Sequence, residues 1–307
     1  MITTILASER LSRVTPLGVR FVDDQNGRVV NDGLMVSAWP TAQPSRVLSM
    51  PLNGTNVYYL LNAPGLRDLS YGAGDDAWWS SLPRRLGFTI EVEDLQARFL
   101  PFRFTASLPQ RGLMRLACGA PPSPVSLPEG AEADGVPLCT APSRPSTPGS
   151  VILRAELWDA TNDAPASWAV LSAITPGAAL RGEQPTRAVA DFRGSVSLHF
   201  PFPDERDFDG GSFDSPAAPD GAPLAGRTWT VQLTAAYGHL PPDPLTLTRP
   251  TPPIPDLCAV LAQPAAKLWD KLGVTQLTTV SMRFGQETLL ASADPGSAPP
   301  PVVLLTT

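Results

Sequence analysis

The side chains that could take part in catalysis are few. The chain has two histidines, His199 and His239, and His199 stands between Leu198 and Phe200 in an alternating stretch, so its side chain is expected to face away from theirs. A histidine acts as a general base only when a nucleophile and an orienting acid lie within hydrogen-bond reach. The spacing indicates no such partners, and there is no GxSxG, HExxH or glycine-rich phosphate-binding motif. We therefore expect His199 to be structural and the protein not to be an enzyme.

The three cysteines, Cys118, Cys139 and Cys258, form no CxxC pair. An odd number at these spacings indicates neither a disulfide framework nor a zinc site, so we expect isolated reduced thiols. The first ten residues lack the basic start and sustained apolar run of a signal peptide. No apolar run approaches the roughly 20 residues needed to cross a bilayer. These features predict folding in the cytoplasm and no membrane span.

One irregular loop, residues 204–226, is acidic and rich in glycine. Its carboxylates could wrap a calcium ion, because hard cations bind several oxygens on a flexible turn. The spacing is not that of an EF-hand, and the alternative is a solvated acidic loop. No other metal and no cofactor is expected. The weak calcium candidates are Asp207, Asp209 and Asp214.

Two places could anchor a partner. Trp78 and Trp79 end a long loop, where an aromatic residue can contact a protein interface or a sugar ring; alternatively, both fold back over the end of their domain. An apolar strand near the C-terminus either completes a sheet of its own fold or pairs with a neighbour. The candidate interface residues there are Val302, Val303 and Leu304.

Short β-strands are the elements expected to carry these residues. Proline makes up 36 of the 307 residues, more than double the average share of about 5%, and this opposes long helices. In residues 21–30 an Asp-Gln-Asn-Gly turn separates two apolar runs, which is a strong hairpin signal. Residues 88–93 alternate with period two, which predicts one buried and one wet face.

The strand pattern occurs twice along the chain. Phe21 corresponds to Leu157, Val57 to Val196 and Phe88 to Trp229, with offsets that drift by only a few residues. Loop insertions between the strands of a duplicated unit would produce this drift. The sequence thus predicts an all-β protein with two tandem immunoglobulin-like or transthyretin-like β-sandwiches.

The expected boundaries follow from composition. Residues 1–117 form the first sandwich, 118–149 a proline-rich linker, and 150–245 the second sandwich. Residues 246–307 form a C-terminal extension, with a short helix capped by Asp256 and a hairpin over 277–290 that turns at Gly285. The net charge of −6 argues against nucleic-acid binding as a main function.

Four phrases carry a resemblance to a known family. They are Val57-Tyr58-Tyr59-Leu60-Leu61-Asn62-Ala63-Pro64-Gly65-Leu66-Arg67, Arg98-Phe99-Leu100-Pro101-Phe102-Arg103-Phe104, Arg154-Ala155-Glu156-Leu157-Trp158-Asp159 and Pro255-Asp256-Leu257-Cys258-Ala259-Val260-Leu261. Together they resemble structural proteins of extracellular contractile injection systems, which are phage-tail-like particles, with tandem sandwiches of the transthyretin or carboxypeptidase-regulatory type.

This resemblance implies a non-enzymatic particle component near the baseplate or sheath, to which no catalytic residue can be carried over. Its partners would be baseplate, sheath or tube subunits, and it would be present in several symmetric copies. It would be assembled in the cytoplasm and could leave the cell with the particle. The alternative is a carbohydrate-binding or cell-surface-binding β-sandwich module that uses Trp78 and Trp79. Under the first hypothesis, deletion of residues 291–307 should weaken incorporation and leave both sandwiches folded.

Overall fold

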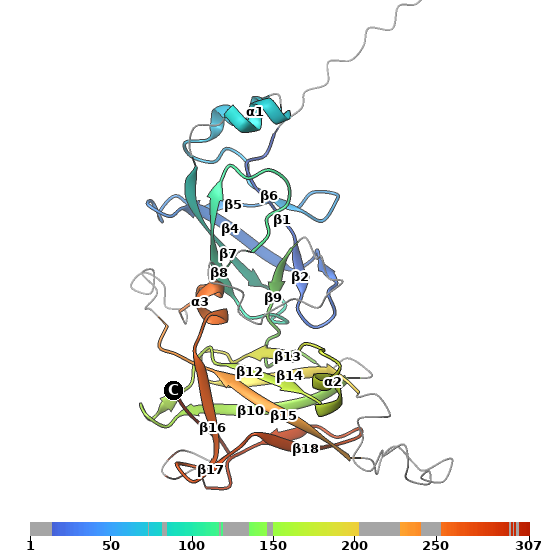
Figure 1. The fold of residues 1–307 in the computed structure, drawn as a ribbon. Helices are drawn as coiled ribbons and strands as arrows, with labels where there is room; N and C mark the ends of the chain where they lie inside the picture. Colours follow the sequence, from blue (N-terminus) through green and yellow to red (C-terminus); the bar gives the residue numbers. More distant parts are fainter. Residues whose placement is uncertain are drawn as a thin grey trace, which may run out of the picture.

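The computed structural model describes residues 14–72, 74–81, 85–116, 118, 135–145, 150–202, 228–240, 253–294, 296, 298 and 301–307. Strands dominate these residues, and the chain is all-β, as predicted (Figure 1). Its described helices are short and none could cross a membrane. They are the 3-10 helix η1 (Arg67–Tyr71) and the α-helices α1 (Asp76–Ser81), α2 (Pro176–Leu180) and α3 (Leu257–Leu261).

The first strand set forms two layers around one hydrophobic core, in which the rings of Phe21 and Phe104 meet edge to face across the layers. One layer contains β1 (Gly18–Val19), β2 (Phe21–Asp23), β3 (Val29–Val30), β6 (Tyr58–Tyr59) and β9 (Val136–Leu138). The other is a sheet in the order β5 (Leu48–Ser49), β4 (Leu34–Pro40), β7 (Leu86–Asp94) and β8 (Phe102–Leu108).

The second strand set encloses a core of its own around Trp229. Strand β16 pairs with both β15 and β20 and so connects its two layers. One layer contains β10 (Ser150–Asp159), β11 (Ala164–Pro165), β14 (Ser195–Pro201), β19 (Thr288–Leu290) and β20 (Val303–Thr306). The other contains β12 (Val170–Ile174), β13 (Thr186–Val189), β15 (Thr228–Ala236) and β18 (Thr279–Arg283), and β17 (Thr275–Gln276) pairs with β16 (Ala265–Lys271).

The order of strand pairing recurs in the two sets. β2 is antiparallel to β3 and parallel to β9, and β10 is antiparallel to β11 and parallel to β20. β4 pairs with β5 and β7, and β12 pairs with β13 and β15. Asp23 and Asp159 end corresponding strands, and their carboxylates accept hydrogen bonds from the amides of Asn26 (2.8 Å) and Asn162 (2.7 Å). The internal repeat expected from the sequence is therefore present in the hydrogen bonding.

The prediction of a linker over residues 118–149 is wrong for residues 135–145. β9 pairs with β2 in parallel, and the amide of Leu100 donates to the carbonyl of Cys139 (2.9 Å). Val136 and Leu138 are buried in the first core. Their burial makes a short strand of a stretch whose proline content suggested a linker. Residues 119–134 and 146–149 lie outside the described residues.

The prediction of a separate C-terminal extension is also wrong. β18 pairs with β15 and β19 pairs with β10, so residues 277–290 cross from one layer to the other and do not form a hairpin, although Gly285 has the positive φ of a turn. β20 lies between β10 and β16. The predicted short helix is confirmed, because Asp256 Oδ1 accepts from the amide of Ala259 at the start of α3 (3.1 Å).

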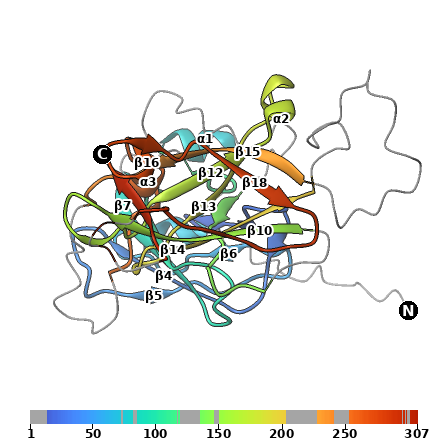
Figure 2. The same cartoon turned by 90° about the horizontal axis from the view of Figure 1, so that it is seen from below.

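The two sets meet through apolar contacts. Trp168, Val170 and Val189 of the second set belong to the core of the first, as do Leu257 and Val260 of α3. Figure 1 shows the sets stacked along one axis with α3 between them, and Figure 2, which looks along that axis, shows α2 projecting from the side. The apolar junction joins the sets into one elongated body.

Candidate functional site

A cavity of about 610 Å³ lies at the junction of the two strand sets. Its described walls come from β4, β7 and β8 of the first set, from the turn and strand between Asp159 and Trp168, from residues 237–240 after β15, and from residues 253–259 around the start of α3. Ligand-binding pockets fall in the range of about 300–1,000 Å³ and occur preferentially between domains. The cavity is therefore the first candidate site.

The first wall is the outer face of the sheet β5-β4-β7-β8. Trp39, Thr89 and Thr105 stand in one row across this sheet, and the hydroxyls of Thr41 and Thr89 lie 3.2 Å apart. The alternation of β7 predicts that this face is wet, yet Thr89 is only 8% and Glu91 3% exposed. The prediction fails at Thr89 because this residue faces the junction cavity, whose other walls belong to the second strand set and to the start of α3.

The opposite wall contains Asp159 and Tyr237. Burial disfavours the ionised carboxylate of Asp159, but hydrogen bonds from Asn162, Thr161 and Tyr237 outweigh it and lower the pKa of Asp159. Burial and the Asp159 carboxylate raise the pKa of Tyr237 to about 12. Tyr237 therefore stays protonated and donates to Asp159. This carboxylate holds its turn together and is not placed as a base for a substrate.

Trp168 lines the cavity with an unusual backbone. Its φ of 64° lies in the left-handed region. For any residue other than glycine this conformation is unfavourable, because the Cβ atom approaches the following carbonyl oxygen. The conformation is held by hydrogen bonds from the Trp168 amide to the carbonyl of Asp191 (3.3 Å) and from Gln263 Nε2 to the Trp168 carbonyl (2.8 Å). In the first strand set, the turn before β4 has Gly33 in the same region, with φ of 69°. The second set thus places a residue with a large ring in a backbone conformation that favours glycine, and this ring packs into the core of the first set.

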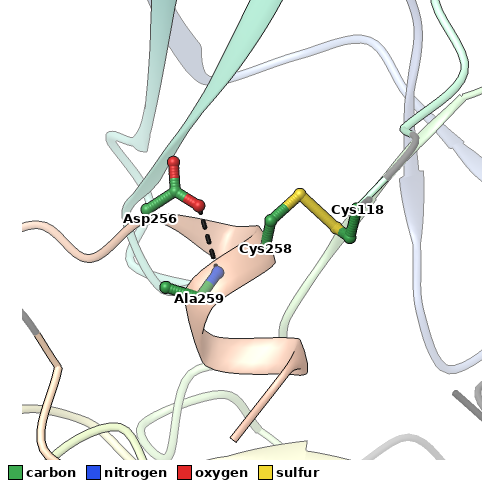
Figure 3. The surroundings of a disulfide bond; sticks show 4 residues. All are labelled: Cys118, Asp256, Cys258 and Ala259. Atoms are coloured by element: carbon green, nitrogen blue, oxygen red, sulfur yellow. Dashed lines mark hydrogen bonds between the residues drawn. A yellow bond between two sulfur atoms is a disulfide. The ribbon is translucent and has the colours of Figure 1, made fainter. Parts of the chain in front are cut away.

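Helix α3 lies between strands β15 and β16 of the second set along the chain, but it packs against the first set. The amide of Arg103 on β8 donates to the carbonyl of Pro255 (2.9 Å), and Leu257 is buried in the first core. A disulfide between Cys118 and Cys258, with Cα atoms 4.9 Å apart, fastens the helix (Figure 3). The expectation of three reduced thiols is thus wrong for two of them, because the fold brings together cysteines that are far apart in sequence.

Cys139 is free and buried. Burial, with a contribution from Asp24, raises the pKa of its thiol well above the usual value. A thiol that resists ionisation is a weak nucleophile. For this cysteine the expectation of an isolated reduced thiol agrees with the structure.

His199 is buried on the sheet face opposite Leu198 and Phe200, which belong to the second core. Its Nε2 lies 2.8 Å from the hydroxyl of Ser197, and its buried Nδ1 has no hydrogen-bond partner among the residues that the structure describes. Burial first, and then the charges of Arg154 and Arg144, lower the pKa of His199. Ser197 and His199 are both buried, so this pair is not open to a substrate in the structure. His239, the other histidine, is exposed at the cavity wall.

The candidate interface residues Trp78 and Trp79 lie on helix α1 at the end of the molecule far from the second set (Figure 1). Their rings meet edge to face with centroids 4.8 Å apart, and both are partly exposed. Asp75 Oδ1 accepts from the Trp78 amide (2.8 Å) and starts the helix. The sequence predicts a loop at this position, and the structure has a short helix.

The C-terminal candidates are placed inside the chain's own fold. Val303 is 0% exposed within β20, and Val302 and Leu304 are buried beside it. The prediction that they contact a partner is therefore wrong, because β20 has its hydrogen-bonding partners in β10 and β16. Of the two alternatives for this strand, completion of its own sheet is the one observed.

The weak calcium candidates Asp207, Asp209 and Asp214 lie outside the described residues. Among the residues that the structure describes, no group of three or more His, Cys, Asp or Glu side chains could hold a metal ion.

The cavity was not predicted from the sequence. Its aromatic walls, Trp39, Trp168 and Tyr237, come from three separated strands or turns. The one available signal is the outer-face position of a large aromatic residue, Trp39, next to the core residue Ala38.

Comparison with known proteins gives little. No family model matches the chain, and no curated protein matches it. Among solved structures, a mutant of the shaft pilin spaA from Lactobacillus rhamnosus GG has 8% sequence identity and a TM-score of 0.20, with 94% of this chain and 96% of the pilin covered. A TM-score this low does not establish a common fold.

Proposed function

We propose that this chain is a non-enzymatic structural subunit of a contractile, phage-tail-like injection particle. In this proposal it is built from two tandem β-sandwiches of immunoglobulin or transthyretin type, and it binds baseplate, sheath or tube subunits in several symmetric copies. The four phrases that resemble such proteins support the assignment to a particle. The recurring strand order and the two cores support the tandem sandwiches.

The junction between the strand sets is the observation that supports a structural role most directly. It combines a shared apolar core, the hydrogen bond from the Arg103 amide of β8 to the Pro255 carbonyl, and the disulfide to α3. These three kinds of contact hold the two strand sets at a fixed spacing. A spacer or clamp in a symmetric assembly requires such a rigid connection. The arrangement of His199 and Asp159, each committed to the fold, supports a role without catalysis.

Particle association tests the proposal. The full chain, tagged at its N-terminus, is expressed with the other genes of its locus, and contractile particles are purified by sedimentation. We expect the chain to sediment with the particles and its omission to remove density near the baseplate or sheath in electron micrographs. Recovery of the whole chain in the unsedimented fraction, with unchanged particles in its absence, would refute the proposal.

The partly exposed tryptophan pair on α1 favours a second candidate, a glycan-binding module. Aromatic rings at a protein surface can stack on sugars, and this pair lies at one end of the body. Glycan binding by the free protein that is lost in the double variant Trp78→Ala, Trp79→Ala would support this candidate. Phe192→Ala is the matched control, because Phe192 is an exposed aromatic residue (37%) of the second set.

A further inference from the structure

Strand β8 has an open edge. It is the last strand of the sheet β5-β4-β7-β8, so within the described part of the chain no strand of this sheet lies along its other side. The amide of Arg103 points to this side and donates to the carbonyl of Pro255 (2.9 Å), and Gln110 beyond the strand donates to Pro16 (2.9 Å). The backbone amides of Thr105 and Ser107 point to the same side as that of Arg103, because the direction of backbone hydrogen-bonding groups alternates from one residue to the next along a strand. Both are exposed, and neither backbone amide has a hydrogen-bond partner on this side in the described structure.

This edge already makes one backbone contact with another segment of the chain. Arg103 and Asp256 form an isolated parallel bridge, so residues 255 and 256 lie along β8 at this point before the chain enters α3. In Figure 1, α3 lies at the end of β8 that faces the second set. The open stretch at Thr105 and Ser107 continues this established pairing toward the other end of the strand.

Two other edge strands are short. β5 has two residues, and β11 has two residues, one of which is Pro165. Short edge strands and prolines prevent unwanted strand addition. β8 has seven residues and no proline within it. β18, its counterpart in the second set, is exposed as well, but the junction cavity adjoins β8 and not β18.

The cavity gives the edge a place for a side chain. Thr105 lines it in the same row as Thr89 and Trp39, on the outer face of the sheet. A strand added beside Thr105 would therefore direct alternate side chains over this row. The nearby acid Asp159 is already satisfied by its own turn, and the aromatic walls Trp168 and Tyr237 suit an apolar group.

We propose that the open edge of β8 beside the junction cavity docks an extended segment of a neighbouring particle subunit. The segment adds to the sheet as a strand and places a bulky apolar side chain in the cavity. This inference rests on the proposed function and names its mode of partner binding. Main-chain hydrogen bonds supply affinity in such strand addition, and the pocket supplies specificity.

The test compares two variants at one position. Thr105→Pro removes the amide donor, whereas Thr105→Val keeps it along with a β-branched side chain. We expect Thr105→Val to sediment with the particle like wild type. Thr105→Pro should be incorporated about fivefold less or worse, as the loss of one backbone hydrogen bond and a clash with the added strand would cause. Circular dichroism checks that each variant is folded, since proline is tolerated at an outward-facing edge position.

Amide hydrogen exchange of the wild-type chain tests strand addition to β8 independently of any variant. Amides of residues 102–108 that face the open edge should exchange at least about tenfold more slowly in the particle than in the free chain. Equal exchange in both states, or equal incorporation of the two folded variants, would overturn the strand-addition proposal and leave the structural role standing. Absence of the wild-type chain from the particle would instead refute the proposed function and this inference together.

Discussion

Replacement of Trp168 by alanine and by glycine should reverse the usual order of stability. In most positions alanine is the more stable of the two, because glycine loses more backbone freedom on folding. At Trp168 the φ of 64° is left-handed, and glycine adopts it without steric cost. We therefore expect Trp168→Gly to be the more stable variant.

The magnitudes follow from burial and backbone geometry. Trp168 is 6% exposed and packs into the first core, so loss of the ring should lower the free energy of unfolding by about 3–5 kcal/mol in either variant. The left-handed backbone costs alanine, like the native tryptophan, about 1–2 kcal/mol relative to glycine, and the greater entropy loss of glycine offsets about 0.5–1 kcal/mol of that difference. The glycine variant should thus be more stable than the alanine variant by up to about 1.5 kcal/mol.

Urea unfolding of both variants and of wild type, followed by circular dichroism, measures these differences. Ser167→Ala and Ser167→Gly are the matched controls, because Ser167 precedes Trp168 and is not among the residues with positive φ. There alanine should be more stable than glycine by about 0.5–1 kcal/mol. Equal or greater stability of Trp168→Ala over Trp168→Gly would refute the backbone argument. A loss below about 1 kcal/mol in both would refute the packing of the ring across the junction.

Four further perturbations probe the joint and the second strand set. Cys258→Ser should lower the free energy of unfolding by about 2–5 kcal/mol, seen as a lower melting temperature, whereas a reducing agent should leave the variant's melting temperature unchanged. Burial and Arg154 lower the pKa of His199 in the fold, so the unfolded chain binds a proton more readily than the folded chain. The free energy of unfolding should therefore fall as the pH drops below about 6.5 and level off below the folded pKa. His199→Gln should reduce this dependence of stability on pH, and an unchanged dependence would contradict the assignment. Gly194→Ala should lower the free energy of unfolding by about 2–3 kcal/mol, because φ at Gly194 is 83° and the new methyl group would collide with the carbonyl oxygen of Leu157. A melting temperature like that of wild type would contradict this close approach of Gly194 to Leu157. Deletion of residues 301–307 should unfold the second set, because β20 is buried between two strands, and resistance of the truncated chain to limited proteolysis would show otherwise.

Local patterns predicted several elements correctly. The turn that begins at Asp23 and its counterpart at Asp159 depend on side-chain bonds to amides two or three residues away. The cap of α3 by Asp256 is also a contact within three residues. Interactions of this range are encoded in adjacent residues, so their presence can be inferred without the rest of the fold.

Predictions from composition and from alternation were wrong where a segment distant in sequence covers the stretch or pairs with it. Proline around residues 135–145 suggested a linker, and only the parallel partner β2 makes a strand of it. The polar side of β7 was expected in water, and Thr89 on that side faces the junction cavity, whose other walls belong to the second strand set and to the start of α3. The same holds for residues 277–290, whose turn at Gly285 is present while its two flanking strands join different layers.

The all-β class, the repeated order of strands and the local turns and caps are encoded in the residues alone, because each depends on residue types over a few positions or on a pattern that occurs twice. The pairing of Cys118 with Cys258, the interior position of β20 and the entry of Trp168 into the core of the other strand set arise only when the chain is folded. These features depend on which segments, far apart along the chain, come to lie side by side, and such proximity leaves no periodic or local signal in the residues themselves.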